Sequence, residues 1–302
     1  MTFEGKRLVI FGCGYIGSAL ARVMTAAGAR VTALTRNPAK AAALREMGLA
    51  TIVAELSSTD WHAQMATDQD WVVNCVSSGG GGMEDYRRSY VGGMQSILTW
   101  LEQSGQPAGT FVYTSSTSVY PQGGGAIVDE TATTAVVSPI VGALLEAENM
   151  LRAASSAGCT RWFILRLAGI YGPGRHYLLD QLRGGTETLV GSDSHRMNLT
   201  HRDDIVSAIL ACLVAPAAVA NEIFNVTDSL PARKAEVVDW LARELGRSVP
   251  RFSNEATGNA RRGGEPVPDR VISSEKIRAT MHWAPRYRDF RAGYTAILRG
   301  AG

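Results

Sequence analysis

The sequence has few cysteines and no long apolar run. Its 4 cysteines, Cys13, Cys75, Cys159 and Cys212, form no CxxC pair and no His/Cys spacing typical of a metal site, so we expect reduced thiols and no metal. It has no run of about 18 apolar residues that would span a bilayer. The first residues do not combine a charged segment with the apolar stretch of a secretory leader, so a cytoplasmic location is expected.

The sequence also has no large excess of charge of one sign. The 302 residues include 30 Lys and Arg against 28 Asp and Glu, which gives a formal net charge of +2. The basic residues are scattered and form no block interleaved with aromatic side chains. This balance favours neither nucleic acid nor an anionic membrane as a partner. The hydrophobic content of 45% is that of a globular protein. The length of 302 residues suits one large domain or two smaller ones.

A glycine-rich turn stands between an expected strand and an expected helix. The apolar residues 8–11 lead into Gly12, Gly14 and Gly17 at GxGxxG spacing, and apolar residues at helical spacing follow. In such a turn the first glycine allows the bend, the second lets a pyrophosphate approach, and the third lets helix and strand pack closely. The sequence therefore predicts a dinucleotide site. The alternative, a turn that serves packing only, leaves the triple spacing unexplained.

The end of the second expected strand, residues 29–34, indicates which dinucleotide binds. An NAD site usually has Asp or Glu about 20 residues after the glycines, where it binds the ribose 2′-hydroxyl. Here Arg36 stands at that place, and its guanidinium suits a 2′-phosphate. Lys40 adds positive charge. The sequence predicts NADP in preference to NAD; the alternative is that Arg36 is a solvated surface residue.

Apolar strands alternate with helices along the first two thirds of the chain. Further strands are expected at residues 51–54, 71–76, 110–114, 161–166 and 223–226, with helices at 91–101, 141–154, 203–213 and 235–245. This alternation indicates an α/β fold with a Rossmann-type, doubly wound parallel sheet. We expect a nucleotide-binding domain over residues 1–171, to which residues 201–226 return. A smaller C-terminal substrate-binding lobe is expected over residues 172–200 and 227–302.

A series of motifs in the same order resembles the extended short-chain dehydrogenases/reductases, the group of the NAD-dependent epimerases and dehydratases of nucleotide sugars. These motifs are the glycine turn and residues 112–120, 129–130, 165–174, 201–204, 222–226 and 283–285. The likeness covers nearly the whole chain. It implies a Rossmann fold, a nicotinamide cofactor and a small-molecule substrate that is sugar-like or a nucleotide sugar.

The resemblance also implies which residues form the site. The expected cofactor contacts are Gly12, Gly14, Tyr15, Ile16, Gly17, Arg36, Glu55, Leu56, Val76, Ser77, Thr114, Ser115 and Ala168. The expected substrate contacts are Ser78, Ser116, Tyr171, Arg175, His176 and Arg196. Ser116 is the expected catalytic residue, because the serine at this position orients the substrate hydroxyl in the family. His201 is expected to be structural, and Asp204 to anchor its helix.

The family's usual proton donor is missing from this sequence. In the family, a tyrosine and a lysine four residues apart share one helical face, and the cation lowers the pKa of the phenol. Those positions fall on Ile140 and Leu144, and no lysine lies between Lys40 and Lys234. His176 or a bound water would then carry the proton. Losing a general acid/base lowers a rate by about 10²–10⁴-fold.

Two functions therefore stay open. The first is an NADP-dependent oxidoreductase or epimerase-like enzyme with a non-standard proton donor, which the glycine turn and Ser116 favour. The second is a catalytically inactive NADP(H)-binding sensor or regulatory protein, which Ile140 and Leu144 favour. The expected helices at 91–101 and 141–154 carry apolar residues on more than one face. In the family these helices meet a second copy, so a homodimer is expected.

Overall fold

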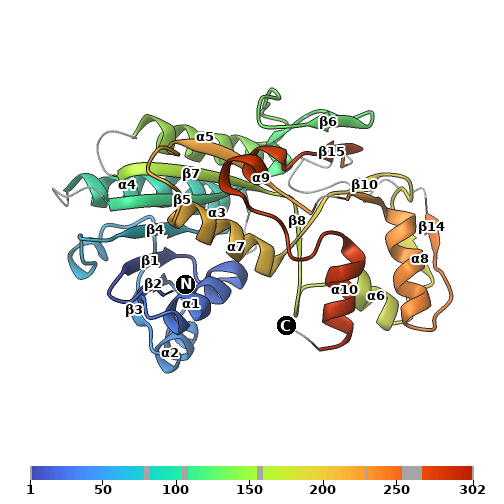
Figure 1. The fold of residues 1–302 in the computed structure, drawn as a ribbon, viewed down its shortest axis with the longest axis horizontal. Helices are drawn as coiled ribbons and strands as arrows, with labels where there is room; N and C mark the ends of the chain where they lie inside the picture. Colours follow the sequence, from blue (N-terminus) through green and yellow to red (C-terminus); the bar gives the residue numbers. More distant parts are fainter. Residues whose placement is uncertain are drawn as a thin grey trace. The chain divides into compact units, whose positions relative to one another are not determined.

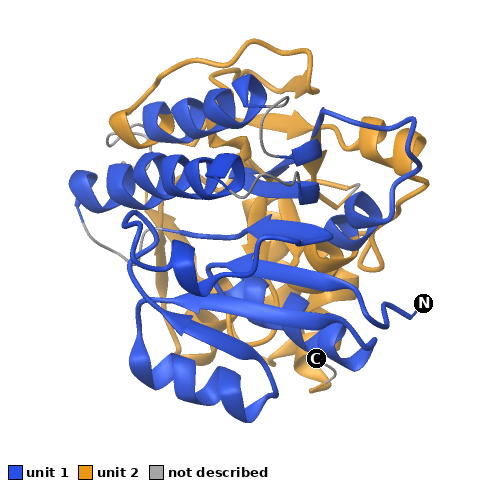
Figure 2. Ribbon diagram, turned by 90° about the vertical axis from the view of Figure 1, so that its left-hand side faces the viewer, with its two compact units in different colours: residues 1–115, 142–166, 208–223 blue, residues 116–141, 167–207, 224–302 orange. Residues whose placement is uncertain are grey.

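A computed structural model describes residues 2–77, 82–103, 108–154, 159–228, 230–253 and 267–300. The chain divides into two compact units (Figure 2). Unit 1 comprises residues 1–115, 142–166 and 208–223, and unit 2 comprises residues 116–141, 167–207 and 224–302. Residues 116–141 thus belong to unit 2, whereas the division expected from the sequence groups them with the nucleotide-binding domain.

A seven-stranded sheet runs in the order β12-β7-β5-β4-β1-β2-β3 (Figure 1). Its strands are β1 (Arg7–Phe11), β2 (Arg30–Thr35), β3 (Ala50–Val53), β4 (Trp71–Asn74), β5 (Ala108–Ser116), β7 (Cys159–Leu167) and β12 (Glu222–Val226). The pairs β1–β2, β2–β3, β1–β4 and β4–β5 are parallel. The strand order reverses next to β1, which is the doubly wound topology. The α/β Rossmann-type fold expected from the sequence is confirmed.

The helices of unit 1 follow the apolar spacing of the sequence. They are α1 (Tyr15–Ala26), α2 (Pro38–Glu46), α3 (Met83–Arg87), α4 (Gly93–Gln103) and most of α5 (Pro139–Ala153). Pro38 stands in the first turn of α2, and Asn37 caps this helix by accepting a hydrogen bond from the Lys40 backbone N–H at 3.1 Å. A π-helical segment, Arg88–Gly92, joins α3 to α4. The sequence analysis did not anticipate this segment.

A buried ion pair ties α5 to the sheet. Arg166 on β7 and Glu148 on α5 are 4% and 1% exposed, respectively. Two hydrogen bonds join them, Nη2 to Oε2 at 2.6 Å and Nε to Oε1 at 3.1 Å. The Ser115 hydroxyl also donates to Glu148 Oε1 at 2.6 Å. Because both charges are buried, losing one partner would cost about 3–5 kcal/mol of stability. Through Ser115, the pair therefore holds the end of β5, whose last residue is Ser116.

Unit 2 is held together by short pairings of segments far apart in sequence. Its two-stranded sheets are β6 (Ala126–Val128) with β15 (Arg270–Ile272), β8 (Gly169–Tyr171) with β11 (Leu199–His201), β9 (Thr188–Val190) with β14 (Arg251–Ser253), and β10 (Arg196–Met197) with β13 (Ala232–Arg233). Its helices are α6 (Tyr177–Arg183), the start of α7 (Arg202–Leu213), α8 (Lys234–Glu244), α9 (Glu275–Met281) and α10 (Phe290–Leu298). Tyr171, Leu179, Val238 and Phe290 belong to the apolar core.

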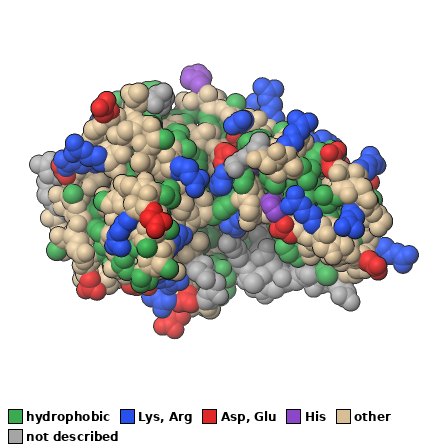
Figure 3. All heavy atoms as spheres, turned by 90° about the horizontal axis from the view of Figure 1, so that it is seen from below, with side chains coloured by type: hydrophobic (Ala, Val, Ile, Leu, Met, Phe, Trp, Pro, Cys, Tyr) green, Lys and Arg blue, Asp and Glu red, His purple; other side chains and the backbone are tan. Residues whose placement is uncertain are grey.

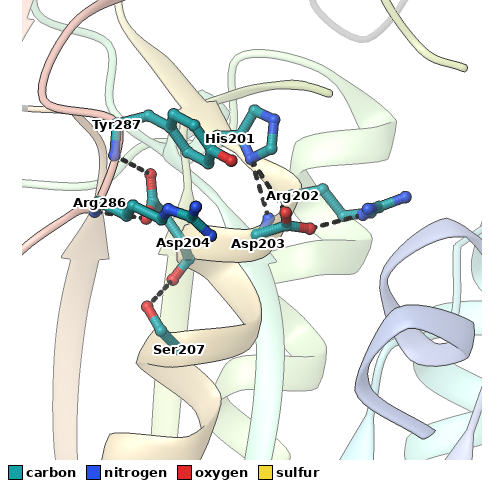
Figure 4. A network of polar contacts seen from close by, with 7 residues as sticks. All are labelled: His201, Arg202, Asp203, Asp204, Ser207, Arg286 and Tyr287. Atoms are coloured by element: carbon teal, nitrogen blue, oxygen red, sulfur yellow. Dashed lines mark hydrogen bonds and ion pairs between the residues drawn. The ribbon is translucent and has the colours of Figure 1, made fainter. Parts of the chain in front are cut away.

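A polar network anchors α7 within unit 2 (Figure 4). The Asp204 carboxylate accepts hydrogen bonds from the backbone N–H groups of Arg286 and Tyr287, at 2.6 and 3.2 Å. His201 Nδ1 accepts from the Asp203 N–H at 3.2 Å, and its ring packs against that of Tyr287 at a tilt of 47°, with the centroids 4.0 Å apart. Burial lowers the pKa of His201 to about 4, so the ring is neutral at neutral pH. Asp204 therefore anchors its helix, as the sequence analysis expected, and His201 belongs to the same network.

A second buried carboxyl, Asp228, lies close enough to this network to interact with it electrostatically. It is 3% exposed, and its Oδ1 atom has no hydrogen-bond partner among the described residues. Burial raises the pKa of Asp228 to about 8; a hydrogen bond from the Leu230 backbone acts in the opposite direction, and the charges of Asp289 and Asp204 raise it further. Asp228 is therefore mainly protonated at neutral pH.

The face drawn in Figure 3 carries basic and acidic side chains side by side rather than a field of one sign. This mixture agrees with the formal net charge of +2.

Asp228→Asn is expected to make folding stability less dependent on pH. The folded protein keeps the Asp228 proton up to about pH 8, whereas the unfolded chain releases it near the ordinary value of 3.8. As pH rises through this window, the wild-type protein loses up to about 1.4 kcal/mol of stability per pH unit from this group. Asparagine has no proton to lose. The melting temperature of the variant should therefore rise relative to wild type as pH is raised, and a constant difference would contradict the account.

Candidate functional site

The glycine turn joins β1 to α1 and has strict steric requirements. Gly12 has a φ of 84°, in the left-handed region, and a Cβ there would lie 2.6 Å from Val76 N. A Cβ at Gly17 would lie 2.4 Å from Gly12 O. At Gly14, in contrast, a Cβ would meet nothing closer than Gly12 O at 3.9 Å. The protein itself requires Gly12 and Gly17, whereas the space above Gly14 is open to a ligand.

The start of α1 favours an anion at this turn. The helix begins at Tyr15 and includes Ile16 in its first turn, with Gly14 as the N-cap. No side chain caps this end, and no acidic residue lies in the first turn. The Ser18 hydroxyl donates to Cys13 O at 2.7 Å. The backbone N–H groups and the helix dipole make such an end a phosphate site.

Two cations and one carboxylate flank the ends of β2 and β3. Arg36 follows β2, and its Nη1 atom lies 3.7 Å from Oε2 of Glu55, which follows β3. Burial raises the pKa of the Cys13 thiol to about 12, and the positive charge of Lys40 acts in the opposite direction. The charge of Lys40 therefore acts on the glycine turn.

The other expected cofactor contacts of unit 1 lie at the carboxyl ends of strands. Asn74 links two of them: its Oδ1 accepts from the Val76 N–H at 3.1 Å, and its backbone oxygen accepts from the Thr114 hydroxyl at 3.2 Å. Ser77 is exposed and Leu56 is buried. The carboxyl ends of parallel strands are where such sheets bind ligands. Ala168 belongs to unit 2, where its N–H donates to Val226 O at 3.1 Å.

Ser116 and the turn after it are held by a distant arginine. The Ser116 hydroxyl oxygen accepts from the Ser118 N–H at 3.2 Å and caps the 3₁₀ turn Thr117–Val119. Arg270, which is 5% exposed, donates from Nη2 to Thr117 O at 2.8 Å and from Nη1 to Tyr120 O. The sequence analysis missed Arg270, because a separation of 153 residues leaves no local pattern.

Asn225 joins three of the motifs on which the family resemblance rests. Its Oδ1 accepts from the Tyr120 hydroxyl at 2.9 Å, its backbone N–H donates to Glu130 Oε1 at 2.6 Å, and its Nδ2 donates to Ser273 O at 3.2 Å. Residues 112–120, 129–130 and 222–226 therefore meet at one buried amide. Tyr120, Glu130 and Asn225 therefore contribute to the architecture of unit 2.

The remaining expected substrate contacts in unit 2 range from buried to exposed. Tyr171 is buried, and its ring packs on Tyr294 with the centroids 5.0 Å apart. Arg175 is exposed and its backbone pairs with Gly172. His176 Nδ1 lies 2.7 Å from Asp180 Oδ1.

Arg196 is engaged by a carboxylate. Its Nη1 donates to Asp269 Oδ2 at 2.6 Å, and its backbone N–H donates to Asp269 Oδ1 at 2.8 Å. Ser78 lies outside the described residues.

The two helical positions that carry the proton-transfer pair in the family are apolar here. Ile140 is half-buried and Leu144 is buried, and both lie on α5. Glu148, one turn further on, is held in its ion pair with Arg166. These side chains offer no group that exchanges a proton with a substrate. Among the described residues, no group of His, Cys, Asp and Glu side chains is arranged to bind a metal, and no helix is long and apolar enough to cross a membrane.

Comparisons with known proteins identify a family and a relative that are similar to this chain. Residues 8–227 match the model of the NAD dependent epimerase/dehydratase family. Protein YeeZ of Escherichia coli strain K12 is 30% identical over 258 residues, which cover 82% of this chain and 87% of YeeZ.

Two solved structures are similar over nearly their whole length. A putative NAD-dependent epimerase/dehydratase from Methylobacillus flagellatus is 27% identical, with a TM-score of 0.74 and 98% of each chain covered. The UDP-glucuronic acid 4-epimerase of Bacillus cereus, in complex with UDP-glucuronic acid and NAD, is 20% identical, with a TM-score of 0.79 and 97% and 99% covered; this is a likeness of fold. From its motifs, its sheet topology and these matches, the chain belongs to the NAD dependent epimerase/dehydratase family.

Proposed function

We propose that this protein is an NADP-dependent oxidoreductase or epimerase-like enzyme that acts on a sugar-like or nucleotide-sugar substrate. The observation that carries the proposal is the glycine turn, in which Gly12 and Gly17 are required by packing while the space above Gly14 is open. The UDP-glucuronic acid bound by the Bacillus cereus epimerase supports the substrate class by analogy of fold. The homodimer and the cytoplasmic location stay predictions of the sequence.

The preference for NADP rests on the charges beside the turn. Arg36 occupies the position after β2 where an NAD site has an acidic residue, and its guanidinium is half-exposed. Lys40 adds a second positive charge that acts on the turn. A planar guanidinium binds phosphate oxygens through two parallel N–H groups, which suits a 2′-phosphate better than a hydroxyl.

Hydride transfer would come from the nicotinamide of the bound cofactor, and the chain supplies positioning and proton transfer. The Ser116 hydroxyl accepts from the Ser118 N–H, so its own proton is available to a substrate oxygen. His176 is the candidate proton donor, because its side chain is only 13% exposed and lies against Asp180.

A second candidate is an NADP(H)-binding sensor without turnover. It is favoured by one specific observation: Ile140 and Leu144 fill the positions of the proton-transfer pair, and Leu144 is buried. A protein of this kind would keep the glycine turn and Arg36 and would bind NADP(H) without converting a substrate.

Arg36→Gln is expected to weaken NADPH binding by about 10-fold or more, because a charged hydrogen bond to phosphate is lost. NADH binding should change by less than about 2-fold, since its ribose carries no phosphate. Titration of both dinucleotides measures the two Kd values. Arg30→Gln is the matched control, because Arg30 is exposed at the other end of β2. Equal weakening of NADPH and NADH would refute the assignment of the 2′-phosphate to Arg36.

His176→Gln is expected to lower kcat by about 10²–10⁴-fold while leaving the Kd for NADPH unchanged. Turnover is followed by NADPH absorbance across a panel of carbonyl compounds and by product analysis for nucleotide sugars. Tyr177→Phe, at the neighbouring exposed position, is the control. Tight NADPH binding by the wild-type protein with no turnover across the panel would overturn the enzyme proposal and support the sensor.

A further inference from the structure

We infer that Glu55 sets how strongly this site prefers NADP to NAD, through competition for Arg36. The inference rests on the proposed function, because it requires the 2′-phosphate to bind Arg36. The carboxylate and the guanidinium lie 3.7 Å apart, with side chains 38% and 48% exposed. They follow β2 and β3, whose parallel pairing brings Thr35 opposite Val53. The carboxylate that the sequence lacks after β2 is therefore supplied from the neighbouring strand.

The backbone on both sides of the pair is fixed. The Ala54 N–H donates to Thr35 O at 3.2 Å, which extends the contact between the strands beyond their last pair. The backbone carbonyl oxygen of Glu55 accepts from the Ser58 N–H at 3.1 Å and from the Ser58 hydroxyl at 3.0 Å. These hydrogen bonds hold the segment that carries Glu55 beside the end of β2. The backbone therefore places the two side chains within reach of each other.

The two dinucleotides would make opposite demands on this pair. A 2′-phosphate on Arg36 competes with Glu55 for the guanidinium N–H groups and is repelled by the carboxylate charge. A ribose 2′-hydroxyl, in contrast, donates a hydrogen bond to a carboxylate, as acidic residues accept it in NAD sites. The pair thus offers a cation to NADP and a carboxylate to NAD.

Removing the carboxylate tests this arrangement without disturbing the fold. Both side chains are partly exposed, so Glu55→Gln leaves no buried unpaired charge. Glutamine keeps the length of the side chain and removes its charge. Glu46→Gln makes the same change of net charge at an exposed position at the end of α2, and it serves as the matched control.

In Glu55→Gln, NADPH should bind about 3- to 10-fold more tightly, because the competitor and the repulsive charge are gone. NADH should bind about 2- to 5-fold more weakly, because a neutral amide accepts a weaker hydrogen bond than a carboxylate. Titrations at low and high salt measure both Kd values, and the gain for NADPH should shrink as salt screens the charges. In the Arg36→Gln background, the further change Glu55→Gln should give a smaller gain for NADPH than in wild type, because it relieves only the repulsion and no longer frees a guanidinium.

The outcomes separate this inference from the proposal on which it rests. If Arg36→Gln weakens NADPH and NADH equally, or if wild type binds neither, the 2′-phosphate assignment fails and the inference fails with it. If Arg36→Gln selectively weakens NADPH but Glu55→Gln leaves the ratio of the two Kd values as in wild type or Glu46→Gln, the assignment stands. The role of Glu55 is then overturned.

Discussion

The close approach of backbone to backbone at the glycine turn is the constraint on which the site depends. Residue 12 must adopt a φ of 84° beside Val76, and residue 17 must pack a first-turn helical residue against Gly12 O. Side chains at these two positions would push β1, β4 and α1 apart. With both positions filled by glycine, the uncapped start of α1 lies directly after the strand. The proposed phosphate site rests on the open space at Gly14 and on the uncapped first turn of this helix.

In helix α5 and in the turn after Ser116, the residues that hold the architecture are present, whereas the family's proton-transfer pair is not. Helix α5 keeps the ion pair of Glu148 with Arg166, and this pair fixes the end of β5 through Ser115. Its positions 140 and 144 are apolar, so the helix retains its packing role without the family's proton-transfer pair. Asn225 and Arg270 likewise hold the turn after Ser116 in place. The family motifs are therefore largely architectural, and they fix a frame whose chemistry can differ.

The fold and the conformation of the glycine turn could be predicted because their patterns are local. Strand and helix periodicity and the spacing of Gly12, Gly14 and Gly17 lie within short windows of sequence. The Arg36–Glu55 and Arg166–Glu148 pairs could not be predicted in this way, since each joins two elements across intervening chain. Only the register of the folded strands brings such side chains together. Arg196 shows the same limit: its contact with Asp269 depends on a segment distant in sequence.

The most direct test of the account is an experimental structure of this protein with NADPH bound. The account predicts the pyrophosphate against the backbone at Gly14 and the first turn of α1, with the 2′-phosphate on Arg36 and the Glu55 carboxylate displaced from the guanidinium. A cofactor bound away from the glycine turn, or a 2′-phosphate that does not contact Arg36, would contradict it.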